Sequence, residues 1–301
     1  MDSIIKIGSK DATIVKQIQK VIGVPIDGVF GPQTRAFLIR WQSINNLVAD
    51  GIVGPKTFEA MGVLDTDQKQ AYFKAGDYKS VIQEYHLPLG EYIKGEKDFQ
   101  NDYLILHHTA GGFNPYRCID HWAKDRRGRV ATEFVIGGQS IKNNNSEYDG
   151  VILQAFPTGC QGWHLGKIDS YYMNRHSVGI EICSMGYLTE ANKTYVGSVV
   201  HDDQICVLDE KFRNKDKWHR YSNDQIESCK DLILFISERD GIDLSVGLID
   251  WIKKEGPTKA FAFKKEASEG KVKGLLTHTN VRKDKMDCFP QPEFIDMLLS
   301  I

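Results

Sequence analysis

The sequence predicts a mixed α/β domain, with a central β-sheet flanked by helices, preceded by a small all-α domain of three helices. Three observations support this prediction. The chain of 301 residues is long enough for two domains, a turn pattern repeats near the N-terminus, and apolar runs typical of strands begin after residue 100. We therefore expect three segments, at residues 1–63, 64–100 and 101–301.

The first segment contains the same turn pattern twice. Residues 27–34 and 50–57 both read D-G-x-x-G-P-x-T. Asp-Gly favours a tight turn, the second Gly tolerates a positive φ, and Pro suits the first turn of a helix. Apolar residues at helical spacing flank the turns, namely Ile14, Val15, Ile18, Val21, Ile22, Phe37 and Trp41. Three short helices around a small core are expected.

The second and third segments differ in amino-acid composition. Residues 64–70 are almost wholly polar, so we expect 64–100 to be a linker and a lead-in segment. Ser222 precedes an apolar helical stripe that ends near Arg239, which predicts a capped helix. Apolar runs typical of strands lie at residues 103–106, 134–136, 151–153 and 178–182. Strands interleaved with helices indicate an α/β domain.

Composition excludes several classes of protein. The 38 basic and 40 acidic residues leave a formal charge of −2, which offers no electrostatic footprint for nucleic acid. No apolar run is long enough for a membrane helix, so we expect no membrane insertion. The first residues lack a basic region followed by an apolar one, which argues against export by a signal peptide. The six cysteines include no C-x-x-C pair, and we expect most of them to be free, buried thiols.

Two separated groups of residues could bind a metal. His107 and His108 stand where a strand gives way to a Gly-rich loop, and since neighbouring strand side chains point to opposite faces, only one of the two can face a given site. Far downstream, His278 is followed by the carboxylate of Asp287 and the thiol of Cys288. A catalytic zinc needs three protein ligands and one open position.

Four motifs occur in a characteristic order: H-H-T-A-G at 107–111, G-W-H-L-G at 162–166, S-V-G-I-E at 177–181, and His278 with K-M-D at 285–287. In this order the sequence resembles the zinc-dependent N-acetylmuramoyl-L-alanine amidases of the type 2 class. Residues 4–63, with their paired turns, resemble the three-helix peptidoglycan-binding domain of cell-wall hydrolases. The resemblance implies Zn²⁺ as cofactor and bacterial peptidoglycan as substrate.

The resemblance also implies the metal ligands. His107 and His278 would bind zinc, and the third ligand would be a carboxylate or a thiolate near the C-terminal motif. The family has a Lys two residues before this ligand, and Lys285 keeps that spacing to Asp287. We therefore predict Asp287. Cys288 stays an alternative, because the Pro-Gly that usually follows the ligand is replaced here and a thiolate also satisfies zinc.

Other residues are assigned roles around the metal. Glu181 is the expected general base, because a carboxylate within a β-run is costly to bury unless it is paired or functional. Lys285 is expected to stabilise the oxyanion. His164 is expected to line the substrate groove, or else to pack beside Trp163. Glu133 is assigned to substrate binding or assistance to the base, with a solvent-facing strand position as the alternative.

The expected function is hydrolysis of the amide bond between N-acetylmuramic acid and L-alanine, with the helical domain tethering the enzyme to the wall. We expect a monomeric phage endolysin that stays in the host cytoplasm until released to the cell wall. Two alternatives stay open: a zinc peptidase acting on the stem peptide, and a non-catalytic peptidoglycan recognition protein. The insertions within residues 185–275 receive no role.

Overall fold

The chain divides into two compact units. The computed structural model describes residues 5–9, 11–62, 82–95 and 100–301. One unit comprises Met1–Gln83 with Asn143–Tyr148, and the other comprises Glu84–Lys142 with Asp149–Ile301. The expected domain boundary and most of the expected linker fall outside the described residues. Of the helices described, none has the length and apolar character needed to cross a membrane.

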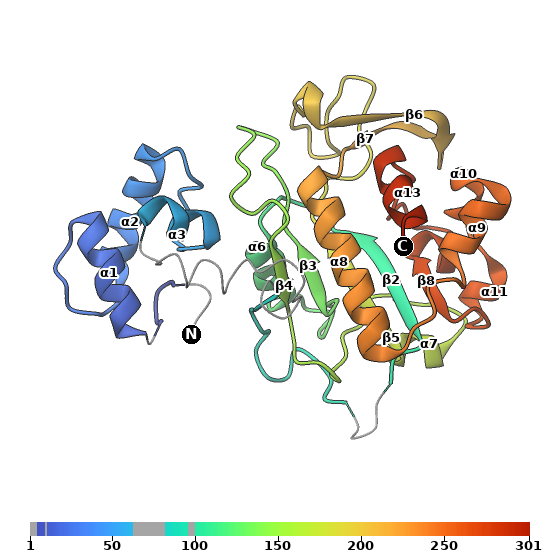
Figure 1. Ribbon diagram of the computed structural model, residues 1–301, viewed down its shortest axis with the longest axis horizontal. Coiled ribbons are helices and arrows are strands. Elements are labelled where there is room, and N and C mark those ends of the chain that lie inside the picture. The colour runs from blue at the N-terminus through green and yellow to red at the C-terminus, as the bar shows by residue number, and fades with distance from the viewer. Residues whose placement is uncertain (1–4, 10, 63–81, 96–99) are drawn as a thin grey trace. The chain divides into compact units, whose positions relative to one another are not determined.

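The first unit contains the three expected helices, α1 (Ala12–Ile22), α2 (Pro32–Ile44) and α3 (Pro55–Met61) (Figure 1). The carboxylate of Asp11 caps α1 by accepting hydrogen bonds from two backbone amides. The helices α2 and α3 each begin at a proline that follows an extended glycine. Their core is formed by buried apolar side chains, including Val15, Ile18 and Leu38.

A glutamine from the preceding helix holds each repeated turn. The side-chain oxygen of Gln19 accepts from the backbone N–H of Gly28 at 2.8 Å, and its nitrogen donates to a carbonyl of the same turn at 3.1 Å. Gln42 repeats both contacts, accepting from Gly51 at 2.9 Å and donating to a turn carbonyl at 2.8 Å. Both glutamines are buried. The sequence repeat is therefore a repeated hydrogen-bonded turn.

The second unit is built on a six-stranded sheet in the order β1-β4-β3-β5-β2-β8. β2 pairs in parallel with β5 and β8, β3 pairs in parallel with β5, and β3 with β4 is antiparallel. The strands are β1 (Ile82–Glu84), β2 (Tyr103–His108), β3 (Phe134–Ile136), β4 (Ile152–Gln154), β5 (Ser177–Ile182) and β8 (Gly274–Thr277). The predicted α/β fold is confirmed. The sheet also includes β1, which lies before the expected start of the domain at residue 101. The sequence did not predict β1, because three residues are too few to show a periodic pattern.

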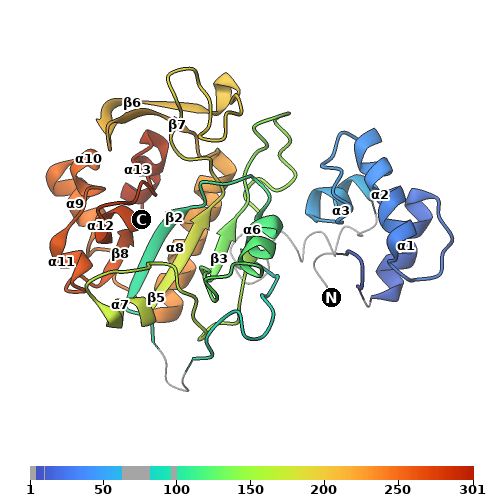
Figure 2. The same ribbon diagram turned by 180° about the vertical axis from the view of Figure 1, so that it is seen from behind.

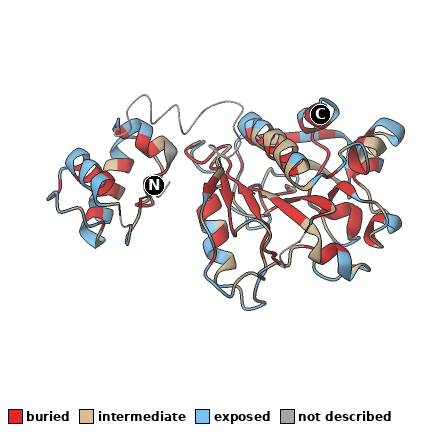
Figure 3. Ribbon diagram, turned by 60° about the horizontal axis from the view of Figure 1, so that its bottom comes forward, coloured by how far each residue is buried: buried red, intermediate tan, exposed pale blue. Residues whose placement is uncertain are grey.

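Helices cover both faces of this sheet. The views in Figures 1 and 2 show α8 (Asn223–Asp240) on one face and α6 (Pro115–Trp122) on the other. Ser222 caps α8 with a reciprocal capping box, as the sequence predicts. Figure 3 shows the strands coloured as buried between the helices. Strands covered on both faces explain the continuous apolar runs of the sequence.

The predicted insertions form structure of their own around the sheet. The first contains η1 (Asp202–Gln204) and a hairpin of β6 (Ile205–Phe212) and β7 (Lys215–His219). Arg213, in the hairpin turn, donates hydrogen bonds to the carbonyls of Thr279 and Arg282. The remaining helices are α7 (Tyr171–Arg175), α9 (Leu248–Glu255), α10 (Pro257–Ala260), α11 (Lys265–Ser268), α12 (His278–Val281) and α13 (Pro292–Leu299). The hairpin therefore holds the segment that leads to Asp287.

Candidate metal centre

Adjacent parallel strands bring the candidate residues to one edge of the sheet. His107, near the end of β2, is paired in register with Glu181 of β5, so both side chains lie on the same face. On the other side of β2, β8 ends at Thr277 and His278 follows as the first residue of α12. Carboxyl ends of parallel strands meet at a common edge, where α/β proteins place their sites.

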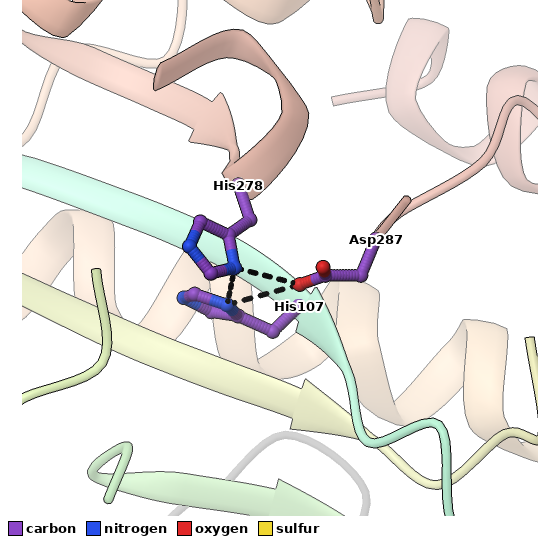
Figure 4. A group of neighbouring side chains, drawn as sticks. All are labelled: His107, His278 and Asp287. Atoms are coloured by element: carbon purple, nitrogen blue, oxygen red, sulfur yellow. Dashed lines mark hydrogen bonds and ion pairs between the residues drawn. The ribbon is translucent and has the colours of Figure 1, made fainter. Parts of the chain in front are cut away.

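His107, His278 and Asp287 point toward one another (Figure 4). Nδ1 of His107 lies 3.0 Å from Nδ1 of His278, and Oδ2 of Asp287 lies 3.2 Å from the first and 2.9 Å from the second. One atom from each residue thus falls within 4.8 Å of the other two. Both histidines are buried, at 1% and 4% exposure.

This donor set fits zinc. Two imidazole nitrogens and one carboxylate oxygen are common zinc ligands in catalytic sites, which keep a fourth position open. Two ligands bound at about 2.0–2.1 Å with a tetrahedral angle between them lie about 3.3 Å apart. The three separations in the cluster are 2.9–3.2 Å, close to this value. The three residues are therefore compatible with a bound zinc ion.

Electrostatics also favour a cation at this point. Burial, together with His278, lowers the pKa of His107 to about 4, so its ring is neutral near pH 7 and offers a lone pair. Burial alone would raise the pKa of Asp287, but the two imidazoles hold it well below its usual value. A neutral imidazole and a carboxylate are the forms that bind metal.

Glu181 lies at the same edge with an unpartnered oxygen. Among the described residues, nothing hydrogen-bonds to its buried Oε2. Burial raises its pKa well above the ordinary value, Asp287 raises it further, and the charge of Lys285 opposes the shift. Lys285 is partly exposed and also lowers the pKa of His107. Asp287 and Lys285 therefore both affect the pKa of Glu181, in opposite directions, and the three side chains belong to one site.

A cavity of about 470 Å³ opens beside Glu181. Its walls are the loop after β2, helix α6 with Arg117 and Trp122, and Tyr195 from the first insertion. The hydroxyl of Tyr195 donates to the carbonyl of Ala110 at 3.0 Å, which fixes the ring at the cavity wall. Glu181 thus lies between the metal centre and a space large enough for part of a substrate.

The structure separates the two neighbouring candidates for the third ligand. Asp287 reaches the imidazoles, whereas the thiol of Cys288 is buried against the hydroxyl of Tyr221. His108 points away from the cluster and its Nδ1 lies 2.9 Å from the same hydroxyl. All six cysteines are free.

Glu133 lies outside the lining of the described cavity. It is 2% exposed, so the solvent-facing alternative is wrong. Its two carboxylate oxygens accept hydrogen bonds from the guanidinium of Arg239, at 2.7 and 3.1 Å. Oε1 also accepts from Gln154 at 2.9 Å. Glu133 therefore ties the sheet to α8 through a buried ion pair, and both oxygens are occupied.

His164 contacts Nε2 of His107, whereas Nδ1 of the same ring faces His278 and Asp287. Nδ1 of His164 is 2.9 Å from Nε2 of His107, and its Nε2 is 2.9 Å from Oγ of Ser177. Burial, together with the neighbouring imidazoles, holds the pKa of His164 well below its usual value. His164 thus contacts a proposed metal ligand and does not line the described cavity. Sequence reasoning missed Ser177 and Arg213, although Ser177 belongs to a motif already noted.

The fold and this cluster define a class of mixed α/β proteins with a candidate zinc centre at the sheet edge. Residues 97–258 match the family model described as N-acetylmuramoyl-L-alanine amidase, and residues 15–61 match a model for a peptidoglycan binding domain. The chain belongs to the N-acetylmuramoyl-L-alanine amidase family. The expected family and enzyme class are confirmed.

Other proteins resemble parts of the chain. A zinc D-Ala-D-Ala carboxypeptidase from Streptomyces albus G is 46% identical over 61 residues, covering 18% of this chain and 24% of that protein. The chain therefore aligns with about a quarter of this curated relative. The solved structure of AmpD is 16% identical, covering 73% of this chain and 94% of its own, with a TM-score of 0.40. The amidase LysC from Clostridium intestinale is 15% identical, covering 73% and 98%, with a TM-score of 0.38.

Proposed function

We propose that this protein hydrolyses the amide bond between N-acetylmuramic acid and L-alanine in bacterial peptidoglycan. The observation that carries the proposal is the convergence of His107, His278 and Asp287 beside Glu181, in a chain of the amidase family. His107, His278 and Asp287 would hold Zn²⁺. When bound, this ion supplies Lewis acidity, which lowers the pKa of a water molecule and polarises an amide carbonyl.

The remaining chemistry falls to the side chains of this chain. Glu181 accepts a proton from the attacking water and passes it to the nitrogen of the leaving L-alanine, because its unpartnered Oε2 is free to take a proton. Lys285 stabilises the negative charge that develops on the carbonyl oxygen, in accordance with its electrostatic influence on Glu181 and His107. The adjacent cavity receives part of the muramyl peptide.

The helical unit supports an action on intact cell wall. Its match to a peptidoglycan binding domain suggests that it holds the enzyme on the insoluble polymer, which raises the effective concentration of the substrate. We further propose that the protein is a monomeric endolysin, held in the host cytoplasm until it reaches the wall. Expression inside a host should then cause lysis only when a membrane-permeabilising protein is co-expressed.

Mass spectrometry of digested peptidoglycan tests the reaction. Zinc-loaded protein should release stem peptides with a free L-alanine amino group and leave intact lactyl groups on the glycan. Shortened stem peptides still attached to muramic acid would instead indicate a peptidase. Binding to the wall without any cleavage would indicate a recognition protein.

A further inference from the structure

We propose that Ser177, His164 and His107 form a hydrogen-bonded relay that fixes the tautomer of His107, which makes His164 a positioning residue of the metal centre. The relay runs from Oγ of Ser177 to Nε2 of His164 at 2.9 Å, and from Nδ1 of His164 to Nε2 of His107 at 2.9 Å. The inference rests on the proposed role of His107 as a zinc ligand.

The carbonyl group of Ser177 determines where the protons of the relay lie. The carbonyl oxygen of Ser177 also lies 3.4 Å from Nε2 of His164, and a carbonyl can only accept a hydrogen bond. A proton on Nε2 of His164 serves both the carbonyl and the hydroxyl oxygen. Nδ1 of His164 is then an acceptor, so His107 carries its own proton on Nε2.

This tautomer directs the free lone pair of His107 to the metal centre. With the proton on Nε2, the unprotonated nitrogen is Nδ1, the atom that lies 3.0 Å from His278 and 3.2 Å from Asp287. The opposite tautomer would place an N–H among the ligand atoms and block metal binding. Ligand histidines commonly have their second nitrogen held in this way by a neighbouring group.

The strand β5 provides both the acceptor and the space for the relay. Residues 177, 179 and 181 alternate onto the same face of the strand. A Cβ atom at Gly179 would lie 3.0 Å from Nδ1 of His164 and 2.6 Å from a methyl carbon of Thr132. Glycine at this position therefore lets the imidazole approach the sheet. The S-V-G-I-E motif thus supplies an acceptor, a gap and, in Glu181, a candidate base.

Burial makes the relay consequential. His107 is 1% exposed, so little water reaches its ring to replace a lost partner. A buried N–H without an acceptor is unfavourable. Without His164, the ring of His107 should rotate or change tautomer, and metal binding should weaken by about 10–100-fold.

Histidine tautomers in the zinc-loaded protein give the first test. We would label the full chain with ¹⁵N-histidine and record two-bond proton–nitrogen spectra near pH 7. The proposal expects protonated Nε2 and unprotonated Nδ1 in both His107 and His164. A proton on Nδ1 of His164 would overturn it, because that nitrogen could then not accept from His107. This measurement needs no variant and no enzymatic activity.

Zinc affinity gives the second test, measured by competition with a chromophoric chelator. His164→Leu should weaken binding about 10–100-fold, whereas His164→Asn, which keeps an acceptor near the position of Nδ1, should retain most of it. The exposed His86 provides a matched control, and His86→Leu should bind zinc like the unaltered protein. Binding by His164→Leu within twofold of the unaltered protein contradicts the relay. If the leucine variant does not fold, the asparagine variant and the tautomer spectra decide.

The two proposals can fail separately. A protein that binds zinc with the expected tautomers but cleaves no peptidoglycan would contradict the amidase proposal and leave the relay in place. Cleavage with unchanged zinc affinity in His164→Leu would contradict the relay alone.

Discussion

Replacing Glu181 with glutamine should abolish most of the activity while leaving the metal centre intact. The side chain lies beside the cluster, and its Oε2 has no partner among the described residues. Burial and the neighbouring Asp287 raise its pKa well above the ordinary value. Glutamine has nearly the same shape but cannot accept a proton, so the variant removes the proposed base and little else.

The expected magnitude follows from the role. Loss of a positioned general base lowers turnover by about 10²–10⁴-fold, which corresponds to about 2.7–5.4 kcal/mol of transition-state stabilisation. The KM should change little, because the amide fills the volume of the carboxyl beside the cavity. Zinc content should be unchanged, because Glu181 is not among the three clustered ligand residues.

The assay combines release of new amino termini from purified peptidoglycan with metal analysis of the same sample. Glu238→Gln provides a matched control, because Glu238 is exposed on α8. Turnover of Glu181→Gln within about threefold of the unaltered protein, with a full complement of zinc, would refute the assignment of the base.

The raised pKa of Glu181 also predicts a pH dependence of stability in the zinc-free protein. A carboxyl whose pKa is higher in the folded state binds its proton more tightly there. Its stabilising contribution is complete below the unfolded pKa, about 4.3, and is lost as the pH rises through the folded pKa. As the pH rises above this value, the unaltered protein should lose unfolding free energy that Glu181→Gln does not lose. The difference between the two should therefore shift in favour of the variant. Identical pH profiles in EDTA would contradict the raised pKa.

Three further predictions concern the metal, the ion pair and the repeat. Chelation should abolish hydrolysis. It should also lower the free energy of unfolding by about 2.7 kcal/mol, compared with protein in a free zinc concentration of 100 times the dissociation constant. Unchanged lysis in EDTA would disprove the zinc dependence. Glu133→Ala should cost about 3 kcal/mol in chemical unfolding, because it deprives Arg239 of a buried partner, while zinc affinity stays equal to that of the exposed control Glu238→Ala. Gln42→Ala should cost about 2–4 kcal/mol in urea unfolding of the full chain, since a turn N–H and carbonyl lose their partner; an equal loss in the exposed control Gln17→Ala would contradict this.

Much of the fold could be predicted because its signals are local. The apolar runs mark strands buried on both faces, and Ser222 marks the start of α8. The repeated turns mark the starts of α2 and α3. The strand β1 escaped prediction because three residues with mixed burial carry no periodic signal. The order of the strands was also beyond reach, since it depends on contacts between distant segments.

The candidate site shows the same division. His107, His278 and Asp287 could be proposed from motifs, but Asp287 and Cys288 are neighbours in the chain and both can bind zinc. Only the path of the loop decides which side chain reaches the imidazoles. Glu133 could not be assigned either, because its partner Arg239 lies on a helix more than 100 positions downstream.

The amino-acid sequence by itself determined which chemical groups are available and the family to which the chain belongs. Local patterns report these properties because helix caps, turns and buried strands depend on neighbouring residues. The tertiary structure decided which groups meet: it brought Asp287 to the histidines, tied Glu133 to Arg239, and placed His164 between His107 and Ser177. Such contacts depend on the packing of segments far apart in the chain, and no single stretch of sequence encodes them.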